Sequence, residues 1–295
     1  MSEYTGFVGF AVSAATIAVA VAAPGRTPAV DAGVLAADAA AVRKGVIRPP
    51  DRGTLLTCYE AGPTGYGLQR QLAALGVTCQ VIAPGLVPTR PTDRLKTDRR
   101  DARHLADALR AGTLTPVRVP TEAEEAFRDL VRARTTAVQV RQRARQRVKS
   151  TLLRWGLRPP GSPAAWGPAY RAWLRPGAPT PTPRDPVWGE LLSQLAETDR
   201  RVDRLTRQIA ATWPTHPLAP LMRAWPGRRG IDGLTAATVA AELGDGAPFT
   251  HPRQVMAGVG WVPSEASSGV TRHQGGLTKT GNAPLRRILG EAAHR

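Results

Sequence analysis

Three acidic residues in the first half of the chain have the types and spacing that metal-assisted chemistry needs. Glu60 follows an apolar run at 53–59, and Asp98 and Asp101 lie three residues apart in KTDRRDA. That spacing places both aspartates on one face of a helix. Converging carboxylates repel each other, and Mg²⁺, which prefers oxygen ligands and assists phosphodiester chemistry, relieves the repulsion. The pattern predicts a Mg²⁺ site; the alternative is that Asp98 caps the helix and Asp101 pairs with Arg100 or Arg103.

A second candidate site is the serine-rich segment PSEASSG at 263–269, which Arg272, His273 and Lys279 follow. A serine hydroxyl in such a segment can act as a nucleophile while nearby cations hold a phosphate. Segments of this composition are also common as plain loops. Composition alone therefore leaves both interpretations open.

Two glycine-rich segments have the spacing to place backbone amides on phosphates. EAGPTGYG at 60–67 lies between an expected strand and an expected helix. GRRGIDGLTAATVAAELG at 227–244 has glycine turns between short helices, as helix-hairpin-helix modules do. The alternatives are a tight strand-to-helix turn for the first segment and a helix packed through small alanines for the second.

The chain carries a large excess of positive charge. Lys and Arg number 40 against 23 Asp and Glu, which gives a formal net charge of +17. The lysines are Lys44, Lys96, Lys149 and Lys279, so most of the positive charge is arginine. Because guanidinium groups match the geometry of phosphates, this charge predicts a nucleic-acid partner.

Much of that charge falls on one expected long helix, from Glu122 to Trp155, which a capping box of Thr121 and Glu124 begins. A helix of one sign repels itself unless a polyanion neutralises it. The residues predicted to bind nucleic acid are Arg132, Arg134, Arg141, Arg143, Arg145, Arg147 and Lys149 of this helix, together with Arg272 and Lys279.

A second expected helix, 187–211, has mixed charges, which is typical of an antiparallel hairpin or coiled-coil arm. Its basic residues Arg201, Arg204 and Arg207 fit two roles equally well. They can pair with the helix's own acids, Asp199 among them, or they can contact DNA.

The elements that must position the acids have an α/β pattern. Alternating apolar residues at 7–23 favour a β-hairpin over 6–22, rather than an export or membrane segment, and hence a cytoplasmic protein without membrane contact. Further along the chain we expect helices at 31–44, 65–75 and 98–110 and strands at 53–59 and 78–83. Short links between strand, helix and strand imply parallel pairing, with Cys58 and Cys79 as buried free thiols.

The predicted domains are an acidic metal-site domain at 1–120, a helical arm at 121–223 and a small, mostly α-helical domain at 224–295. Within the arm, residues 158–186 are rich in proline and glycine and are predicted to be an irregular linker.

Taken together and in order, several segments resemble the DEDD transposases of bacterial insertion sequences. They are YEAGPTGYGLQRQL, KTDRRDARHLADALRAGTLTPVRVP, RDLVRAR, GIDGLTAATVAAELGD, PRQVMAGVGWVPSEASSG and GGLTKTGNAPLRRIL, and the resemblance covers about residues 6–293. The resemblance implies an N-terminal α/β domain of RuvC-like, RNase-H-like fold and a C-terminal transposase domain with a nucleophilic serine.

Carried over residue by residue, the resemblance makes Glu60, Asp98 and Asp101 three of the four family acids. It makes Ser267 the nucleophile, with Ser268 as the other candidate. The implied mechanism is attack of the serine on a DNA phosphate to give a covalent phosphoserine, with Mg²⁺ activating the phosphate. The implied partners are DNA, a structured noncoding guide RNA and further copies of the chain in a homo-oligomer.

Two features depart from the family pattern. The opening strand reads GFAVSA, which puts Ala11 where the first family acid is expected. The chain also ends at Arg295, where family members usually continue, so the serine domain is expected to be truncated. Both departures predict an impaired copy, and the alternative function is a catalytically inactive nucleic-acid-binding remnant of such a transposase.

Overall fold

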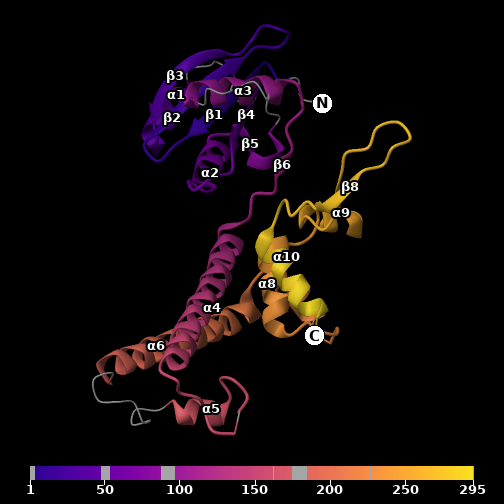
Figure 1. Ribbon diagram of the computed structural model, residues 1–295. Helices are drawn as coiled ribbons and strands as arrows, with labels where there is room; N and C mark the ends of the chain where they lie inside the picture. Colours follow the sequence, from indigo (N-terminus) through magenta and orange to yellow (C-terminus); the bar gives the residue numbers. More distant parts are fainter. Residues whose placement is uncertain are drawn as a thin grey trace. The chain divides into compact units, whose positions relative to one another are not determined.

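The computed structural model describes residues 4–47, 54–87, 97–161, 163–174, 185–225 and 227–294. The chain forms two compact units, Met1–Val119 and Pro120–Arg295 (Figure 1). Each unit has a hydrophobic core of its own. No helix within the described ranges has the length and apolar character needed to cross a membrane.

The first unit is built on a six-stranded mixed sheet of order β3-β2-β1-β4-β5-β6. Its strands are β1 (Gly6–Val12), β2 (Thr16–Ala22), β3 (Val30–Ala36), β4 (Leu55–Glu60), β5 (Thr78–Ile82) and β6 (Pro116–Val117). Strands β1 and β2 form the predicted hairpin, while β1, β4 and β5 run parallel to one another. The predicted hairpin and the predicted parallel pairing are both confirmed.

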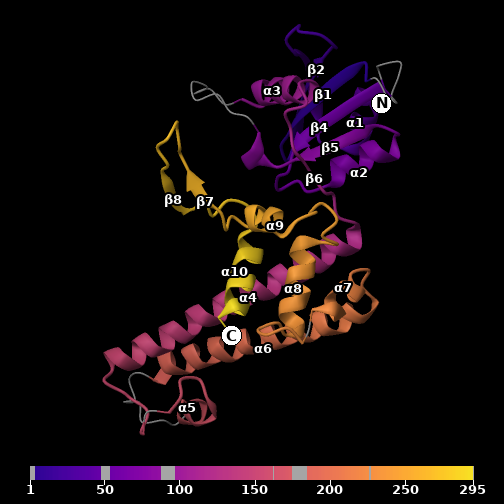
Figure 2. The same cartoon turned by 90° about the vertical axis from the view of Figure 1, so that its right-hand side faces the viewer.

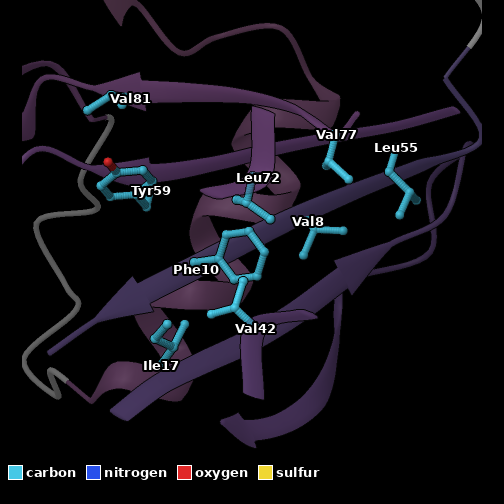
Figure 3. Close-up of a cluster of buried hydrophobic side chains, with 9 residues drawn as sticks. All are labelled: Val8, Phe10, Ile17, Val42, Leu55, Tyr59, Leu72, Val77 and Val81. Carbon is cyan, nitrogen blue, oxygen red and sulfur yellow. The ribbon is translucent and has the colours of Figure 1, made fainter. Parts of the chain in front are cut away.

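Helices cover both faces of this sheet. They are α1 (Ala39–Ile47), α2 (Gly67–Ala74) and α3 (Asp98–Arg110), and a 3-10 turn at Pro84–Leu86 follows β5. Val8 and Phe10 of β1 pack with Val42 of α1 and Leu72 of α2 (Figure 3). The opposite face of β1 packs on α3, because successive side chains of a strand point to opposite faces.

The helix predicted at 31–44 is wrong over its first half. Residues Val30–Ala36 form β3, which pairs antiparallel with β2. Gly33 has a φ of +106°, a conformation that an α-helix does not contain. Helix α1 begins later, where Asp38 Oδ1 accepts a hydrogen bond from Ala41 N at 2.8 Å. Edge pairing to β2 therefore overrides the helical propensity of the alanines.

The second unit is organised around two long antiparallel helices, α4 (Glu122–Arg154) and α6 (Asp185–Thr212), which lie side by side in both views (Figures 1 and 2). The capping box of Thr121 and Glu124 is present at the start of α4, as predicted. Arg134 of α4 bonds Thr206 near the end of α6, whereas Arg147 bonds Gln194 nearer its start.

The segment predicted to be an irregular linker, 158–186, contains a helix, α5 (Pro168–Trp173). Tyr170 and Leu174 are buried against Trp188 and Leu195 of α6. Burial of these aromatic and aliphatic side chains stabilises structure that the proline and glycine content argues against. Residues 175–184 of the predicted linker lie outside the described ranges.

The C-terminal part of this unit is mostly helical, as predicted, with one hairpin. Its elements are a 3-10 turn at Trp213–Thr215, α7 (Ala219–Ala224), α8 (Gly233–Leu243), α9 (Pro252–Gly258), β7 (Pro263–Glu265), β8 (Gln274–Leu277) and α10 (Ala283–Ala293). Helix α8 is buried along its length, largely through small alanines, and lies in a core shared with α4 and α6. This is the packing alternative considered for 227–244.

Candidate active site

A pocket at the carboxyl ends of β1 and β4 brings the predicted acids together. Glu60, Asp98 and Asp101 line this cavity of about 290 Å³, and so does Ala11. Ala11 lies beside Glu60 because β1 and β4 run parallel with Phe10 opposite Tyr59. The pocket therefore gathers the three acids and the position at which a fourth is expected.

Helix α3 reaches this pocket because Gly9 lets it lie directly against β1. A Cβ atom at Gly9 would stand 2.2 Å from the backbone oxygen of Ala102 and 2.6 Å from the nitrogen of Ala106. Both alanines are fully buried. This close approach holds the first turn of α3, with Asp98 and Asp101, beside the ends of the strands.

The donor types in this pocket suit Mg²⁺, but the side chains are not gathered around one point. Carboxylate oxygens are the ligands that Mg²⁺ prefers. Among the residues that the structure describes, no three His, Cys, Asp or Glu side chains are placed to hold one metal ion. Ala11 presents a methyl group on the β1 side, so the pocket has no carboxylate there.

The sequence left a second role open for each aspartate: a helix cap for Asp98 and an ion pair with an arginine for Asp101. Thr97, not Asp98, caps α3, since its side chain accepts from Arg100 N. Asp98 instead lies in the first turn, where its charge favours the helix dipole. Arg103, considered as a partner for Asp101, lies 3.7 Å from Asp31 on β3. Asp31 is not among the residues that line the acid pocket.

The glycine-rich segment 60–67 forms a tight strand-to-helix turn. The Tyr59 hydroxyl donates to the Gly65 carbonyl at 3.0 Å, and Gly65 has a φ of +64° that favours glycine. Gly62 and Pro63 of this turn line the acid pocket. The turn thus supplies one wall of the pocket.

Ser267 lies on an exposed hairpin in the second unit, next to a carboxylate. Its Oγ donates to Glu265 Oε1 at 2.8 Å and accepts from the backbone nitrogen of His273 at 3.3 Å. Arg272 Nε lies 3.5 Å from the same Glu265 oxygen. A hydroxyl, a carboxylate and a guanidinium therefore lie together at this surface.

Ser268, the other candidate, belongs to the turn that closes the hairpin. Its backbone N–H and carbonyl both bond Thr271, at 3.1 Å each. Gly269 has a φ of +58° and Val270 stands fully in solvent, as in a two-residue hairpin turn. Lys279, which follows the hairpin, is exposed.

The basic face of α4 is partly neutralised by one acid of α6. Asp199 lies 3.7 Å from Arg141 and 3.5 Å from Arg145, and it accepts from Arg171 at 3.0 Å. Asp199 therefore pairs across the helices, not with the arginines of its own helix. Because three guanidinium groups share one carboxylate, the cluster keeps a net positive charge.

The other predicted nucleic-acid residues of α4 differ in their surroundings. Arg132 forms a two-armed ion pair with the buried Glu242 of α8. Lys149 lies over the ring of Trp166, 5.9 Å from its centroid. Arg143 and Arg147 are exposed. Arg132 is exposed too, but its guanidinium already binds a carboxylate, so Arg143 and Arg147 are better placed for a polyanion.

Comparison with known proteins bears on what this arrangement does. A family model described as a transposase matches residues 14–155, and another, described as a transposase of the IS116/IS110/IS902 family, matches residues 228–295. The chain is 41% identical over 289 residues to y4qE, a protein of Sinorhizobium fredii named as a transposase; the match covers 97% of this chain and 70% of y4qE. The chain belongs to the IS116/IS110/IS902 family of transposases. The first matched range begins at residue 14 and therefore does not include Ala11.

Two more relatives of this transposase support the assignment. The transposase of insertion sequence IS1533 from Leptospira borgpetersenii is 33% identical over 67% of this chain and 58% of its own length. A protein of Pseudomonas aeruginosa named as a family 20 transposase is 30% identical over 79% of this chain and 69% of its own length. Membership of this family implies interaction with DNA.

Three acids of this transposase bind predicted functional residues, and the sequence did not identify these contacts. Glu265 had a local signal, because it lies only two residues before Ser267 in the chain. Asp199 and Glu242 had none, because the α4 arginines that they bind, Arg145 and Arg132, lie 54 and 110 positions away in the chain.

Proposed function

We propose that this transposase cuts and rejoins DNA through the hydroxyl of Ser267. The observation that carries the proposal is the hydrogen bond from Ser267 Oγ to Glu265 Oε1, 2.8 Å long, on an exposed hairpin. A carboxylate at that distance is within reach of the proton that the hydroxyl must lose to become a nucleophile. Arg272, beside Glu265, supplies positive charge for a phosphate.

The proposed step is a phosphoryl transfer. Ser267 Oγ forms a bond to the phosphorus of a DNA phosphodiester, and its proton passes to the Glu265 carboxylate. The bond from phosphorus to one deoxyribose oxygen breaks, and that oxygen takes a proton from water, whose hydroxide is neutralised by the proton held on Glu265. The product is a phosphoserine ester and a free DNA hydroxyl. Attack by the hydroxyl of another strand reverses the step and rejoins DNA without an external energy source.

The acid pocket is proposed to serve the same reaction. Glu60, Asp98 and Asp101 are the residues that would hold Mg²⁺, which when bound polarises a phosphate oxygen. The acid-bearing unit is proposed to have a RuvC-like fold, on the support of its mixed sheet with acids at the end of β4 and the start of α3, beside Ala11 of β1. Because Ala11 removes one ligand, binding of Mg²⁺ is expected to be weak and cleavage by this copy impaired.

A homo-oligomer and a structured guide RNA complete the proposal. The support for the RNA is the positive charge of α4. Exposed arginines such as Arg143 and Arg147 lie along this helix. Phosphates of a folded RNA would neutralise that charge.

The second candidate function, an inactive nucleic-acid-binding remnant, is favoured by Ala11. The same chain would then bind DNA and RNA through its basic residues without cleaving either. The change Ala11→Asp separates the two functions, because it restores the fourth carboxylate at the place where Ala11 lines the pocket.

The experiment incubates the full chain with Mg²⁺, a supercoiled plasmid carrying the DNA that flanks its gene, and RNA transcribed from those flanks. Protein–DNA adducts are then trapped in denaturant and resolved on a gel. The proposal predicts an adduct that is faint with the natural chain, stronger with Ala11→Asp, and absent with Ala11→Asp combined with Ser267→Ala.

Matched variants identify the residue that forms the adduct. Ser268→Ala in the same background should leave the adduct in place; if it alone abolishes the adduct, Ser268 is the nucleophile. An adduct that survives loss of both serines would refute the serine mechanism, and cleavage without any adduct would point to acid-and-metal chemistry alone. Absence of cleavage and of Mg²⁺ binding in Ala11→Asp would mean that loss of one acid does not explain inactivity.

A further inference from the structure

The hairpin that carries Ser267 ends in an apolar side chain. Gly269 and Val270 are the two central residues of its turn, and the backbones of Ser268 and Thr271 bond each other on either side. Val270 has a relative exposure of 105%, so its side chain adds no packing to the fold. In both views the hairpin projects away from the helices of its own unit (Figures 1 and 2).

The turn gives no local reason for a valine at this position. Gly269 has a φ of +58°, and Val270 is not among the residues of positive φ, which is the pattern of a type II′ turn. Turn positions favour Gly, Pro, Asn, Asp and Ser. A fully hydrated valine gains nothing from the hydrophobic effect, whereas a partner that covers it would bring that gain.

Behind the tip, the side chains change from apolar to polar to charged. Ser268 and Thr271 place hydroxyls directly behind Val270, and Arg272 follows with a guanidinium that is 68% exposed. A DNA duplex has the same order from its axis outward: the apolar faces of stacked bases, then sugars, then charged phosphates. A hairpin whose tip points into a duplex therefore matches it in each layer.

We propose that Val270 is an apolar wedge that inserts between two base pairs of the DNA that Ser267 attacks. Apolar side chains that enter a base step in this way unstack it and kink the duplex. The small residues Gly269 and Ser268 keep the tip narrow enough to enter a groove, while Arg272 contacts the phosphates outside it. This inference rests on the proposed function in placing DNA at the hairpin.

Val270 lies close enough to Ser267 to act on DNA at the reacting phosphate. It follows Ser267 by three positions, and an extended chain of that length spans at most about 11 Å. Because stacked base pairs are about 3.4 Å apart, the opened step lies within about three base pairs of the phosphate that Ser267 attacks. Unstacking at that place frees the strand end that must leave before another strand is joined.

A second copy of the chain is a less suitable partner for this tip. A stable protein interface buries about 800 Å² on each partner, around an apolar core. The large apolar side chains that the hairpin exposes are Val270 at the tip and Leu277 at the far end of β8, with polar or small residues between them. A base step, in contrast, accepts a single side chain.

The experiment measures unstacking with the full chain in EDTA, so that Mg²⁺-assisted cleavage does not occur. The probe is a short G·C duplex with a single TA step, because such steps unstack most easily. Its adenine is replaced by 2-aminopurine, whose fluorescence rises when stacking is lost. At saturating protein we expect this rise with the natural chain, and we expect the level of the free duplex with Val270→Ser.

The affinity for the same duplex, carrying an end label, is measured by fluorescence anisotropy over a series of KCl concentrations. Burial of a valine side chain corresponds to about 10-fold in affinity, so Val270→Ser should weaken binding by up to about that factor. The slope of log K against log salt should not change, because no charge is lost. Val270→Met, which keeps an apolar side chain at the tip, should retain both the fluorescence rise and the affinity.

Leu277→Ser is the matched control. It makes the same kind of change on the same hairpin, but Leu277 ends β8, away from the turn. It should therefore keep the fluorescence rise. An equal loss of the rise in Leu277→Ser, or an unchanged rise in Val270→Ser, would overturn the wedge. Val270→Ser that sediments as a smaller species, with its DNA response unchanged, would show that the tip contacts another protein copy.

The wedge and the serine chemistry fail in different ways. A serine adduct in the cleavage experiment, together with a 2-aminopurine signal that ignores Val270→Ser, would keep the proposed function and overturn the wedge. A signal that depends on Val270, without any adduct, would keep the wedge and overturn the serine chemistry. Because Val270 adds no packing, the unfolding temperature of Val270→Ser should equal that of the natural chain, so loss of the fold does not explain a lost signal.

Discussion

Arg132 and Glu242 form a two-armed ion pair that joins α4 to α8. Arg132 Nε lies 2.8 Å from Glu242 Oε1, and Arg132 Nη2 lies 2.8 Å from Glu242 Oε2. The Glu242 side chain is only 1% exposed, whereas that of Arg132 is 50% exposed. Asn282, just before α10, donates to the same carboxylate at 2.8 Å. Three segments of the unit thus meet at one buried charge.

Arg132→Ala should lower the free energy of unfolding by about 2–3 kcal/mol, because it leaves the buried carboxylate without its main partner. Urea denaturation of the full chain measures the change. Combining Arg132→Met with Glu242→Leu should restore much of the stability, since both charges are then gone. Equal stability of Arg132→Ala and the natural chain would show that the pair does not hold these helices together.

The same carboxylate predicts a pH dependence. Burial alone raises the pKa of Glu242, but hydrogen bonds from Arg132 and Asn282 and the charge of Arg132 outweigh burial and hold the pKa below its usual range. Since the folded pKa is lower than the unfolded one, the stabilisation is complete above the unfolded pKa of about 4.3 and is lost as pH falls through the folded pKa. Thermal unfolding in acid should show a smaller decline for Glu242→Gln than for the natural chain.

Gly9→Ala should destabilise the first unit by about 1–3 kcal/mol, because the added methyl group forces α3 away from β1. The displacement would also carry Asp98 and Asp101 away from Glu60. Chemical denaturation measures the loss. Gly67→Ala serves as the control, since a Cβ there has no atom within 4 Å. A similar response of the two variants would contradict the close-packing explanation.

Glu265→Gln should slow formation of the serine adduct by about 10²-fold, the lower end of the usual contribution of a general base. The substitution keeps the size of the side chain and an oxygen acceptor for Ser267 but removes the basic carboxylate. Rates are compared in the Ala11→Asp background by quenching the adduct reaction at intervals. Partial activity of Glu265→Asp is expected, and an unchanged rate in Glu265→Gln would exclude this carboxylate as the base.

The two cysteines should be unreactive in the folded chain. Burial raises the pKa of Cys79 to about 11 and also raises that of Cys58. At pH 8 a thiol of that pKa is ionised in roughly one molecule in a thousand, and the thiolate is the reactive form. Iodoacetamide followed by mass spectrometry should label both residues in urea and neither without it. Rapid labelling of the native chain would contradict their position in β4 and β5.

The parts of the fold that could be predicted are those with local signals. Helix α3 follows from apolar residues at helical spacing, although its cap is Thr97 and not Asp98, and α4 follows from its capping box. Strand β3 could not be predicted, because its hydrogen bonds to β2 are formed between distant residues and its alanines favour a helix. Helix α5 is likewise held by packing against α6. The proline and glycine content of its segment gives no local signal for a helix.

The candidate site divides in the same way. The placement of Glu60, Asp98 and Asp101 at one pocket could be predicted, since a strand end and a helix start are each visible locally. The partners of the basic helix could not be predicted. Asp199 and Glu242 reach α4 from other helices, and only the packing of those helices decides which arginines remain available to a polyanion.

The hairpin that carries Ser267 lies outside any hydrophobic core, since every residue from 263 to 277 is exposed. Backbone hydrogen bonds and a few polar contacts hold it, so bending or re-pairing it costs little free energy. The hydroxyl of Ser267, the proposed nucleophile, is thereby uncoupled from the stability of the rest of its unit. Substitutions that weaken the helical core should therefore leave the local geometry of the hairpin intact.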